Sequence, residues 1–394
     1  MIELAERPRT RHVSRRAEAA PIAFLRRLDW VLLAAAFALV GYGLWVISGI
    51  TRFDVPGDES YYVVRQGIAA GIGIACLVAA AVLPIDLARR HWQLVYGVTL
   101  ALMIVVFVAA ETVRGSKRWV DLGFIQFQPS ELGKVVFVLA IAGFLVERVG
   151  RVTRWRTVFS AIGLGTPPIL LVFLQPDLGT ALVYGAALFA LLLFVGVRWR
   201  QLITLLAIGV IAIASVLWLL PGAGIQVLKP YQAARLTLDP GADPSGITYN
   251  LNQSITAVGS GGLTGRGVVE ASQTRLDYLP EHATDFAFAS LAEQRGFVGS
   301  AILLLLYLLV VWRGLRVVTV AGDLYGAVVA GGLVFAFLFQ IFVNVGMTMG
   351  VAPVTGIPLP FVTVGGSSMV ANLVLIGVLQ GIHARGELAG RQPL

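Results

Sequence analysis

Long apolar runs, separated by short polar segments, recur along most of the 394-residue chain. A helix needs roughly 20 apolar residues to cross the hydrocarbon core of a bilayer. Ten runs approach or reach this length, and they lie near Trp30–Ile50, Gln66–Ile85, Gln93–Ala110, Glu131–Val149, Val158–Leu174, Thr180–Val197, Leu202–Leu220, Phe286–Trp312, Tyr325–Met347 and Gly366–His383. The pattern predicts an all-α polytopic membrane protein, with the fifth span short and kinked at Pro167-Pro168.

Composition supports this prediction, because 57% of the residues are hydrophobic and only 13% are charged, too few to cover a soluble globule of this size. The single cysteine, Cys76, lies in an apolar run and excludes an internal disulfide framework. The net charge of +8 comes largely from clusters between the apolar runs, where Lys and Arg fix topology, so nucleic-acid binding is unsupported.

The loop charges predict which side of the membrane each loop faces. Arginine clusters alternate with loops that hold most of the acidic residues, which places both termini in the cytoplasm. Residues 1–28 and 385–394 are then cytoplasmic tails, and 29–384 form the membrane domain. The loop 221–284, between the seventh and eighth spans, is extracytoplasmic and too long for a simple connector, so we expect it to be structured or functional.

Basic residues in an outer loop run against this topological bias. Arg114, Lys117 and Arg118 precede the fourth span on the predicted outer side. Such residues are consistent with an anionic ligand, although ordinary loop charges are an equal alternative.

The start of the fourth span combines polar residues with helix-start signals. Pro129 suits the first turn of a helix and Ser130 can cap it. Glu131 and Lys134 are spaced i, i+3 and can form an ion pair on one helix face. A pair within the membrane usually lines a cavity, and the alternative is an interfacial anchor.

Two further outer segments carry candidate residues. Asp177 follows Gln175-Pro176 and, taken alone, is best interpreted as a helix cap. The glycine-rich segment 259–267 can bring backbone N–H groups close to an oxyanion, and Arg266 would add charge. Because this segment is neither G-x-G-x-x-G nor a Walker A sequence, nucleotide binding is unsupported.

The last outer segment, residues 345–368, contains three prolines and ends in Gly365-Gly366-Ser367-Ser368. Its non-helical backbone is tolerated beside a membrane only where protein or water satisfies it. We expect it to line the same cavity as Asp285, a carboxylate at the point where the long loop enters the eighth span. An ionisable residue there is a functional candidate. Of the histidines only His282 faces this region, so no multi-histidine metal site is available.

At these residues the chain closely resembles the SEDS family (shape, elongation, division and sporulation), the multi-pass peptidoglycan polymerases of bacteria. The resemblance rests on Arg118-Trp-Val-Asp-Leu-Gly, Gln128-Pro-Ser-Glu-Leu, Gln175-Pro-Asp-Leu-Gly-Thr, Gln253-Ser with Gly259-Ser-Gly-Gly-Leu, Leu279-Pro-Glu with Thr284-Asp-Phe, and Pro353-Val-Thr-Gly-Ile-Pro-Leu-Pro-Phe with Gly365-Gly-Ser-Ser. Arg27-Leu-Asp-Trp30 and Trp119-Val-Asp-Leu-Gly-Phe-Ile-Gln-Phe look more like the elongation members than the division members.

The resemblance implies ten transmembrane helices in the bacterial cytoplasmic membrane and glycosyl transfer on lipid II at an outward-facing site. Asp285 matches the family's essential aspartate, read as the general base, and undecaprenyl pyrophosphate is the leaving group. We expect the substrate to contact Lys117, Arg118, Gln128, Glu131, Lys134, Asp177, Arg266, Glu281, Ser367 and Ser368. The expected partners are a class B penicillin-binding protein and other elongation proteins, and a divalent cation (Mg or Mn) is the one cofactor considered, with no nucleotide or organic cofactor.

Two positions depart from the family pattern. The family commonly has His before the Thr-Asp pair, where this chain has Ala283 with His282 one place earlier. It also commonly has Ser-Tyr where this chain has Thr363-Val364. Both departures bear on the hydrogen bonding around Asp285. The alternatives to an elongation polymerase are a division polymerase, a lipid II flippase and a non-catalytic scaffold.

Overall fold

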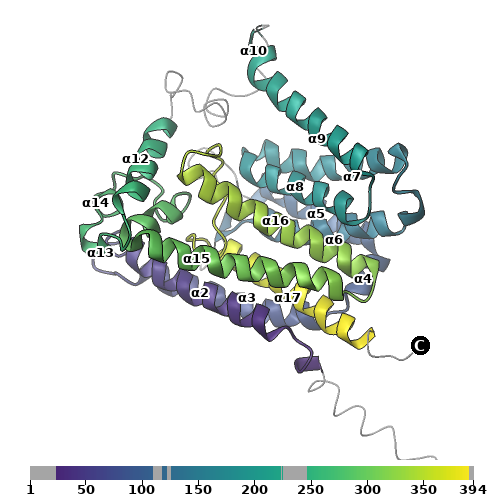
Figure 1. Ribbon diagram of the computed structural model, residues 1–394, viewed down its shortest axis with the longest axis horizontal. Helices are drawn as coiled ribbons and strands as arrows, with labels where there is room; N and C mark the ends of the chain where they lie inside the picture. The colour runs from purple at the N-terminus through teal and green to yellow at the C-terminus, as the bar shows by residue number, and fades with distance from the viewer. Residues whose placement is uncertain (1–23, 110–117, 122–125, 223, 225–245, 390–394) are drawn as a thin grey trace, which may run out of the picture.

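The computed structural model describes residues 24–109, 118–121, 126–222, 224 and 246–389. Within these ranges the chain is mostly helical (Figure 1). The helices are α2 (Trp30–Ile50), α3 (Tyr61–Val82), α4 (Ile85–Arg90), α5 (Trp92–Ala109), α6 (Pro129–Val146), the 3-10 helix η1 (Val149–Arg151), α7 (Trp155–Leu174), α8 (Leu178–Phe194), α9 (Trp199–Ala214), the π-helix η2 (Ser215–Leu219), α10 (Leu220–Gly222), α12 (Ile247–Ser260), α13 (Gly267–Glu270), α14 (Ser272–Arg275), α15 (Ala287–Val320), α16 (Leu324–Thr348) and α17 (Gly366–Ala389).

The predicted membrane segments are confirmed as helices. Among the described residues, eight helices are long and apolar enough to cross a membrane, and two shorter apolar helices cover Trp92–Phe107 and Leu178–Phe194. Together they correspond to the ten predicted spans. The chain is therefore an all-α multi-pass membrane protein with a large loop between its seventh and eighth spans.

Helix α7 is longer than predicted and runs unbroken through Pro167 and Pro168. A proline leaves the carbonyl four residues earlier without its helical partner. For Pro168 that carbonyl belongs to Leu164, and the Tyr96 hydroxyl of α5 donates to it at 2.9 Å. A neighbouring helix thus satisfies the backbone group that the proline leaves free, as a membrane interior requires.

The start of α6 differs from the prediction. The helix begins at Pro129 with Gln128 at the N-cap and no side-chain cap, so Ser130 is not the cap. Ser130 is buried inside the first turn, and its carbonyl accepts the Tyr184 hydroxyl at 2.9 Å. Just before α6, two unpredicted short strands, β1 (Val120–Asp121) and β2 (Gln126–Phe127), pair antiparallel with Val120 opposite Phe127.

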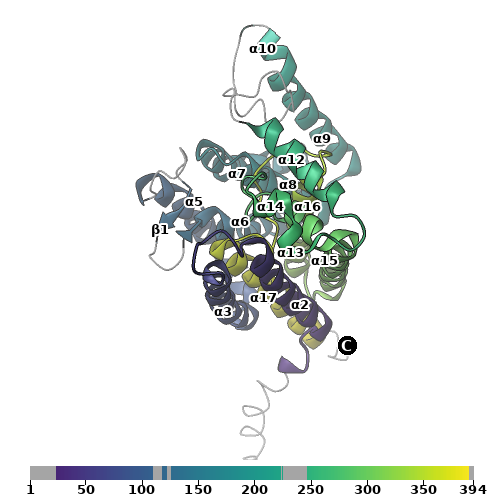
Figure 2. The same ribbon diagram turned by 90° about the vertical axis from the view of Figure 1, so that its left-hand side faces the viewer.

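The bundle has two distinct ends (Figures 1 and 2). At one, the loop end, α12, α13 and α14 gather beside the start of α15. At the other, the terminal end, Asp29 before α2 meets Gln380 near the end of α17. Helix α9 extends away from the other helices in both views, and Leu206 and Val210 on it are exposed.

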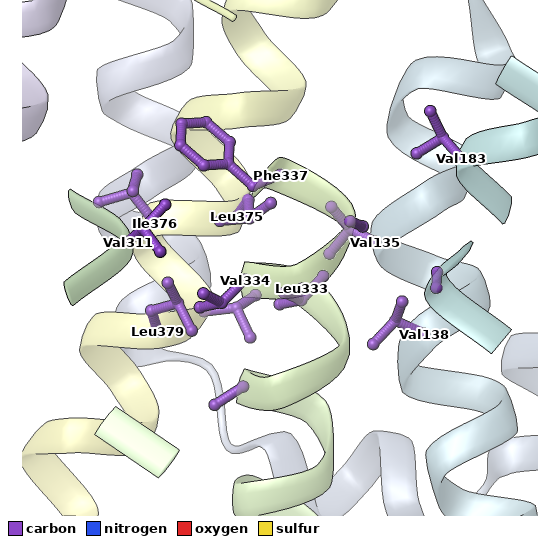
Figure 3. Packing of buried hydrophobic residues seen from close by; sticks show 14 of the residues in the cluster. Val135, Val138, Val183, Val311, Leu333, Val334, Phe337, Leu375, Ile376 and Leu379 are labelled. Carbon is purple, nitrogen blue, oxygen red and sulfur yellow. The ribbon is translucent and has the colours of Figure 1, made fainter. Parts of the chain in front are cut away.

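The core lies between the long helices. Figure 3 shows Leu333 and Phe337 of α16 close to Leu375 of α17, with Val135 of α6 on the other side of α16. Helix α17 also packs closely against α3, because a Cβ added to Gly377 would lie 2.3 Å from the Leu77 carbonyl oxygen. Small residues let membrane helices approach in this way. Helix α17 continues past its predicted end at His383, through the first residues of the predicted tail, to Ala389.

Candidate functional site

Asp285 lies in a tight turn immediately before α15, where the sequence placed it. The turn closes on Glu281, which has a positive φ of 57° and whose carbonyl accepts the N–H groups of Thr284 and Phe286, both at 3.1 Å. The Thr284 hydroxyl donates to Glu281 Oε2 at 2.8 Å. Glu281 therefore builds the turn, while the half-buried Asp285 occupies the position just ahead of the helix.

Three consecutive carbonyls of this turn are held by distant segments. The Val364 N–H donates to the Ala283 carbonyl at 3.0 Å. The Thr363 hydroxyl donates to the Thr284 carbonyl at 3.0 Å, and Asn344 Nδ2 of α16 donates to the Asp285 carbonyl at 3.1 Å. The two places where the chain departs from the family pattern are thus in direct contact with each other.

A second group of predicted residues meets where α6, α8 and α17 begin. Gln128 Nε2 donates to Asp177 Oδ2 at 3.0 Å, and the Gln128 N–H donates to Ser367 Oγ at 2.8 Å. Asp177 also caps α8, since its Oδ1 accepts the Thr180 N–H at 3.0 Å. Arg118 donates from Nε to the Gln175 carbonyl and from a terminal nitrogen to the Pro176 carbonyl. The structure therefore joins at one place three separate segments that the sequence predicts to lie on the outer side.

The predicted ion pair of α6 is confirmed and has an unpredicted partner. Lys134 Nζ donates to Glu131 Oε2 at 2.9 Å and to Gln340 Oε1 of α16 at 3.0 Å. All three side chains are buried and line a small pocket between α6, α16 and α17. The side chain of Asn372, also at this pocket, donates to Ser368 Oγ at 3.2 Å.

Two amides of α16 connect the pocket to Asp285. Gln340 Nε2 donates to the Pro358 carbonyl at 3.1 Å, and Asn344 Nδ2 donates to the Ile357 carbonyl at 2.7 Å. Because these amides are four residues apart, they lie on one helix face. That face supports the proline-rich segment between the pocket and the Asp285 turn.

The glycine-rich segment has a structural role that the sequence did not reveal. Helix α15 is broken at Gly296, which has φ 65° and ψ −161°. The N–H groups of Phe297 and Val298, which begin the second half of the helix, donate to the carbonyls of Gly262 and Leu263 at 2.8 and 3.0 Å. A Cβ added to Gly261 would lie 1.9 Å from a carbonyl oxygen of α15, so a larger residue cannot replace this glycine without displacement.

Arg266 belongs to this segment and lies apart from the Asp285 turn. Its side chain is exposed, and its Nε donates to the Ser260 carbonyl at 3.1 Å. Its backbone N–H donates to the Glu293 carbonyl at 2.9 Å, at a point about 9 Å along α15 from the helix start, at about 1.5 Å per residue. A role for Arg266 in substrate binding stays a prediction, and Lys117 and Arg114 lie outside the described residues.

His282 joins the turn to the loop between α2 and α3. Its Nε2 lies 3.0 Å from Asp54 Oδ1, and its Nδ1 faces Asp277 Oδ1 at 3.6 Å, in ion-pair range but too far for a hydrogen bond. Burial lowers the pKa of His282, but the hydrogen bond and charge of Asp54, with the charge of Asp277, outweigh it and raise the pKa above 6.5.

The described ranges contain no group of three or more His, Cys, Asp or Glu side chains that could hold a metal ion. Sequence reasoning missed Gln66, Gln340 and Asn344, which fix the loop-end segments. The sequence signal that could have found them is an amide side chain inside an apolar run, because burying an amide is costly unless it is hydrogen-bonded.

The fold and these contacts define a multi-pass helical membrane protein with a carboxylate held at the mouth of its bundle. The sequence profile of the FtsW/RodA/SpoVE family, described as cell cycle proteins, matches residues 26–387. The chain belongs to this family, which is the SEDS family of the sequence resemblance.

Individual relatives agree with this assignment. The peptidoglycan glycosyltransferase MrdB of Escherichia coli (strain K12) is 34% identical over 365 residues, covering 92% of this chain and 96% of MrdB. A chain from a structure described as "Structural coordination of polymerization and crosslinking by a peptidoglycan synthase complex" is 30% identical with a TM-score of 0.75, covering 91% of this chain and 98% of that one. The rod shape determining protein RodA of Thermus thermophilus is 28% identical with a TM-score of 0.65, covering 90% and 96%.

Proposed function

We propose that this chain is a peptidoglycan glycosyltransferase that polymerises lipid II into β-1,4 glycan strands during cell elongation. It acts in the cytoplasmic membrane of a bacterium, with both termini in the cytoplasm and the loop end facing outward. The names of the relatives MrdB and RodA support the elongation role.

The observation that carries this proposal is the fixed position of Asp285. Its turn is held through the carbonyls of Ala283, Thr284 and Asp285, so the carboxylate leaves a rigid backbone. The N-terminal end of α15 behind it favours a negative charge. Asp285 accepts the proton of the acceptor's 4-hydroxyl as that oxygen attacks C1 of the donor, and in-line attack on an α-linked donor gives the β bond.

The leaving pyrophosphate needs positive charge as the bond to C1 breaks. The starts of α6, α8 and α17 meet around Gln128, Asp177 and Ser367, and helix N-termini favour anions. We propose that the pyrophosphate is bound there. Arg118, which contacts Gln175 just before α8, and Lys117, which precedes it in the sequence, would supply positive charge. A divalent cation would supply further positive charge. The described residues contain no group of three His, Cys, Asp or Glu side chains that could hold a metal ion, so the cation would take most of its ligands from the pyrophosphate.

A polar route through the whole bundle would favour a flippase over an enzyme. The polar side chains Glu131, Lys134 and Gln340 lie toward the loop end, and the pocket that they line is otherwise bordered mainly by apolar residues such as Leu333 and Phe337. Figure 3 shows Val334 of α16 close to Leu379 and Ile376 of α17, and all three belong to the buried apolar core. This arrangement supports glycosyl transfer at one membrane face.

A class B penicillin-binding protein is the proposed partner, and other elongation proteins would join the same complex. The peptidoglycan synthase complex to which the chain is structurally similar combines polymerisation with crosslinking. A transpeptidase beside the loop end would receive the glycan where it is made.

The test is polymerisation of purified lipid II by the detergent-solubilised chain, with and without a class B penicillin-binding protein. We expect Asp285→Asn to abolish glycan synthesis while leaving the thermal unfolding transition unchanged. Asp58→Asn, at an exposed aspartate in the loop between α2 and α3, is the matched control and should keep full activity. Glycan synthesis by Asp285→Asn at the wild-type rate would disprove the mechanism, and adding EDTA to the wild-type reaction would decide whether a divalent cation takes part.

A further inference from the structure

Thr363 occupies a central place between three segments of the loop end. Its side chain is 4% exposed, and its Oγ1 donates to the Thr284 carbonyl at 3.0 Å while accepting the Leu359 N–H at 2.8 Å. Its own backbone is held by α3, since Gln66 Nε2 donates to the Thr363 carbonyl at 3.2 Å and Gln66 Oε1 accepts the Gly365 N–H at 3.1 Å. The hydroxyl thus belongs to a rigid frame.

The contact with Thr284 acts directly on the backbone of Asp285. The Thr284 carbonyl belongs to the peptide plane that precedes Asp285, and the Asp285 carbonyl belongs to the plane that follows it. Thr363 holds the first plane and Asn344 holds the second. Because a peptide unit is planar, fixing both planes fixes the two backbone dihedrals of Asp285 and hence the direction of its Cα–Cβ bond.

We propose that Thr363 and Asn344 are positioning residues that aim the Asp285 carboxylate at the acceptor hydroxyl. This inference rests on the proposed function of Asp285 as general base. The hydrogen bonds of the two side chains go to the backbone carbonyls on either side of the Asp285 Cα, so each acts through one peptide plane.

The chemistry of the Thr363 site requires a hydroxyl, because one atom must donate to Thr284 and accept from Leu359. A serine can do both, whereas valine, which has the shape of threonine, can do neither. The pair Thr363→Ser and Thr363→Val therefore separates hydrogen bonding from packing. A matched control is Thr166→Val in α7, where the hydroxyl donates to the Ile162 carbonyl of its own helix at 2.7 Å.

The experiment measures kcat, KM for lipid II and the pH profile of kcat for each purified variant, normalised to the folded fraction. We expect Thr363→Val to lose at least about tenfold in kcat, since a misplacement on the order of 1 Å can cost about a hundredfold. KM should change little, and the acid limb of the kcat profile, which reports protonation of the general base in the complex, should move. Thr363→Ser and Thr166→Val should both resemble the wild type, and Asn344→Asp, which replaces the donor by an acceptor, should behave like Thr363→Val.

Equal normalised kcat values and pH profiles for Thr363→Val and Thr363→Ser would overturn the proposal. If Thr363→Val fails to fold, Thr363→Cys replaces it, because a thiol is a weak hydrogen-bonding group of similar size to serine. The proposed function fails separately, if the wild-type chain makes no glycan or if Asp285→Asn keeps the wild-type rate.

Discussion

The two ends of the bundle use buried polar groups in different ways. At the terminal end, Arg313 of α15 binds Asp29 through both oxygens, with Nε at 3.2 and 2.9 Å and a terminal nitrogen at 2.6 Å. Asp29 Oδ1 also accepts the Leu32 N–H at the start of α2, and Gln380 of α17 binds both the N–H and the carbonyl of Asp29, each at 2.8 Å. This network joins three helices and satisfies both oxygens of its carboxylate.

At the loop end, polar side chains hold loop backbone more than one another. Gln66, Gln340 and Asn344 each bind carbonyls of the segment that packs against Asp285 or of the turn itself. One hydrogen-bond acceptor is left over, since the buried Asn344 Oδ1 has no hydrogen-bond partner among the described residues. The contacts at the terminal end therefore join helices to one another, whereas those at the loop end fix the backbone of Asp285, the proposed general base. Substitutions at the two ends should separate unfolding from activity.

The largest effect on stability is expected for Arg313→Met. It leaves the Asp29 carboxylate buried without its cation, and breaking a buried ion pair in this way costs about 3–5 kcal/mol. Denaturant unfolding in detergent measures the loss. Arg316→Met removes an exposed arginine from the same helix and should change the free energy of unfolding little.

The double variant Asp29→Asn with Arg313→Met then tests the role of the terminal network. Removing both charges should recover most of the lost stability. Glycan synthesis per folded molecule should equal that of the wild type. A strong loss of glycan synthesis in the folded double variant would show that the terminal end also serves the reaction.

A smaller loss of stability is expected for Lys134→Met. Lys134 makes a single close contact with Glu131, whereas Arg313 makes three with Asp29, so the cost should fall near the lower end of the same range, about 3 kcal/mol. Denaturant unfolding again provides the measurement.

Here the double variant should behave differently from its terminal counterpart. Glu131→Gln with Lys134→Met should recover stability, but polymerisation of lipid II should stay low, because we place both residues among the substrate contacts. Full recovery of activity would mean that the pair is structural only, and the contrast between the two ends would fail.

The sequence predicted the helices more completely than the contacts between them. The apolar runs predicted the spans because a bilayer demands length and apolarity, and the i, i+3 spacing predicted the Glu131–Lys134 pair. The contacts of Asn344 with Asp285 join residues 59 positions apart, which no local pattern encodes. The break at Gly296 was missed for the same reason, because its partners lie in the glycine-rich segment on the preceding loop.

The smallest effect is expected at His282, where the loop end depends on pH. His282 gains a partner in Asp54, and the charges of Asp54 and Asp277 raise its pKa above 6.5 despite burial. A group whose pKa is raised by folding stabilises the fold fully below the pKa of the unfolded state, and this contribution is lost as pH rises through the folded-state pKa. The stability difference between the wild type and His282→Gln should therefore be greatest below about pH 6.5 and should shrink above it.

Denaturant unfolding at a series of pH values checks this dependence, with His91→Gln, at an exposed histidine by α4, as the control for the substitution itself. Asp54→Asn should weaken the same pH dependence, because the histidine then loses its hydrogen-bonded anion at 3.0 Å and keeps only the charge of Asp277. A stability difference that stays constant across the series would mean that His282 holds the turn as a neutral group, through its contact with Asp54, and that its charge adds nothing to the contacts that hold the carbonyls of Ala283, Thr284 and Asp285.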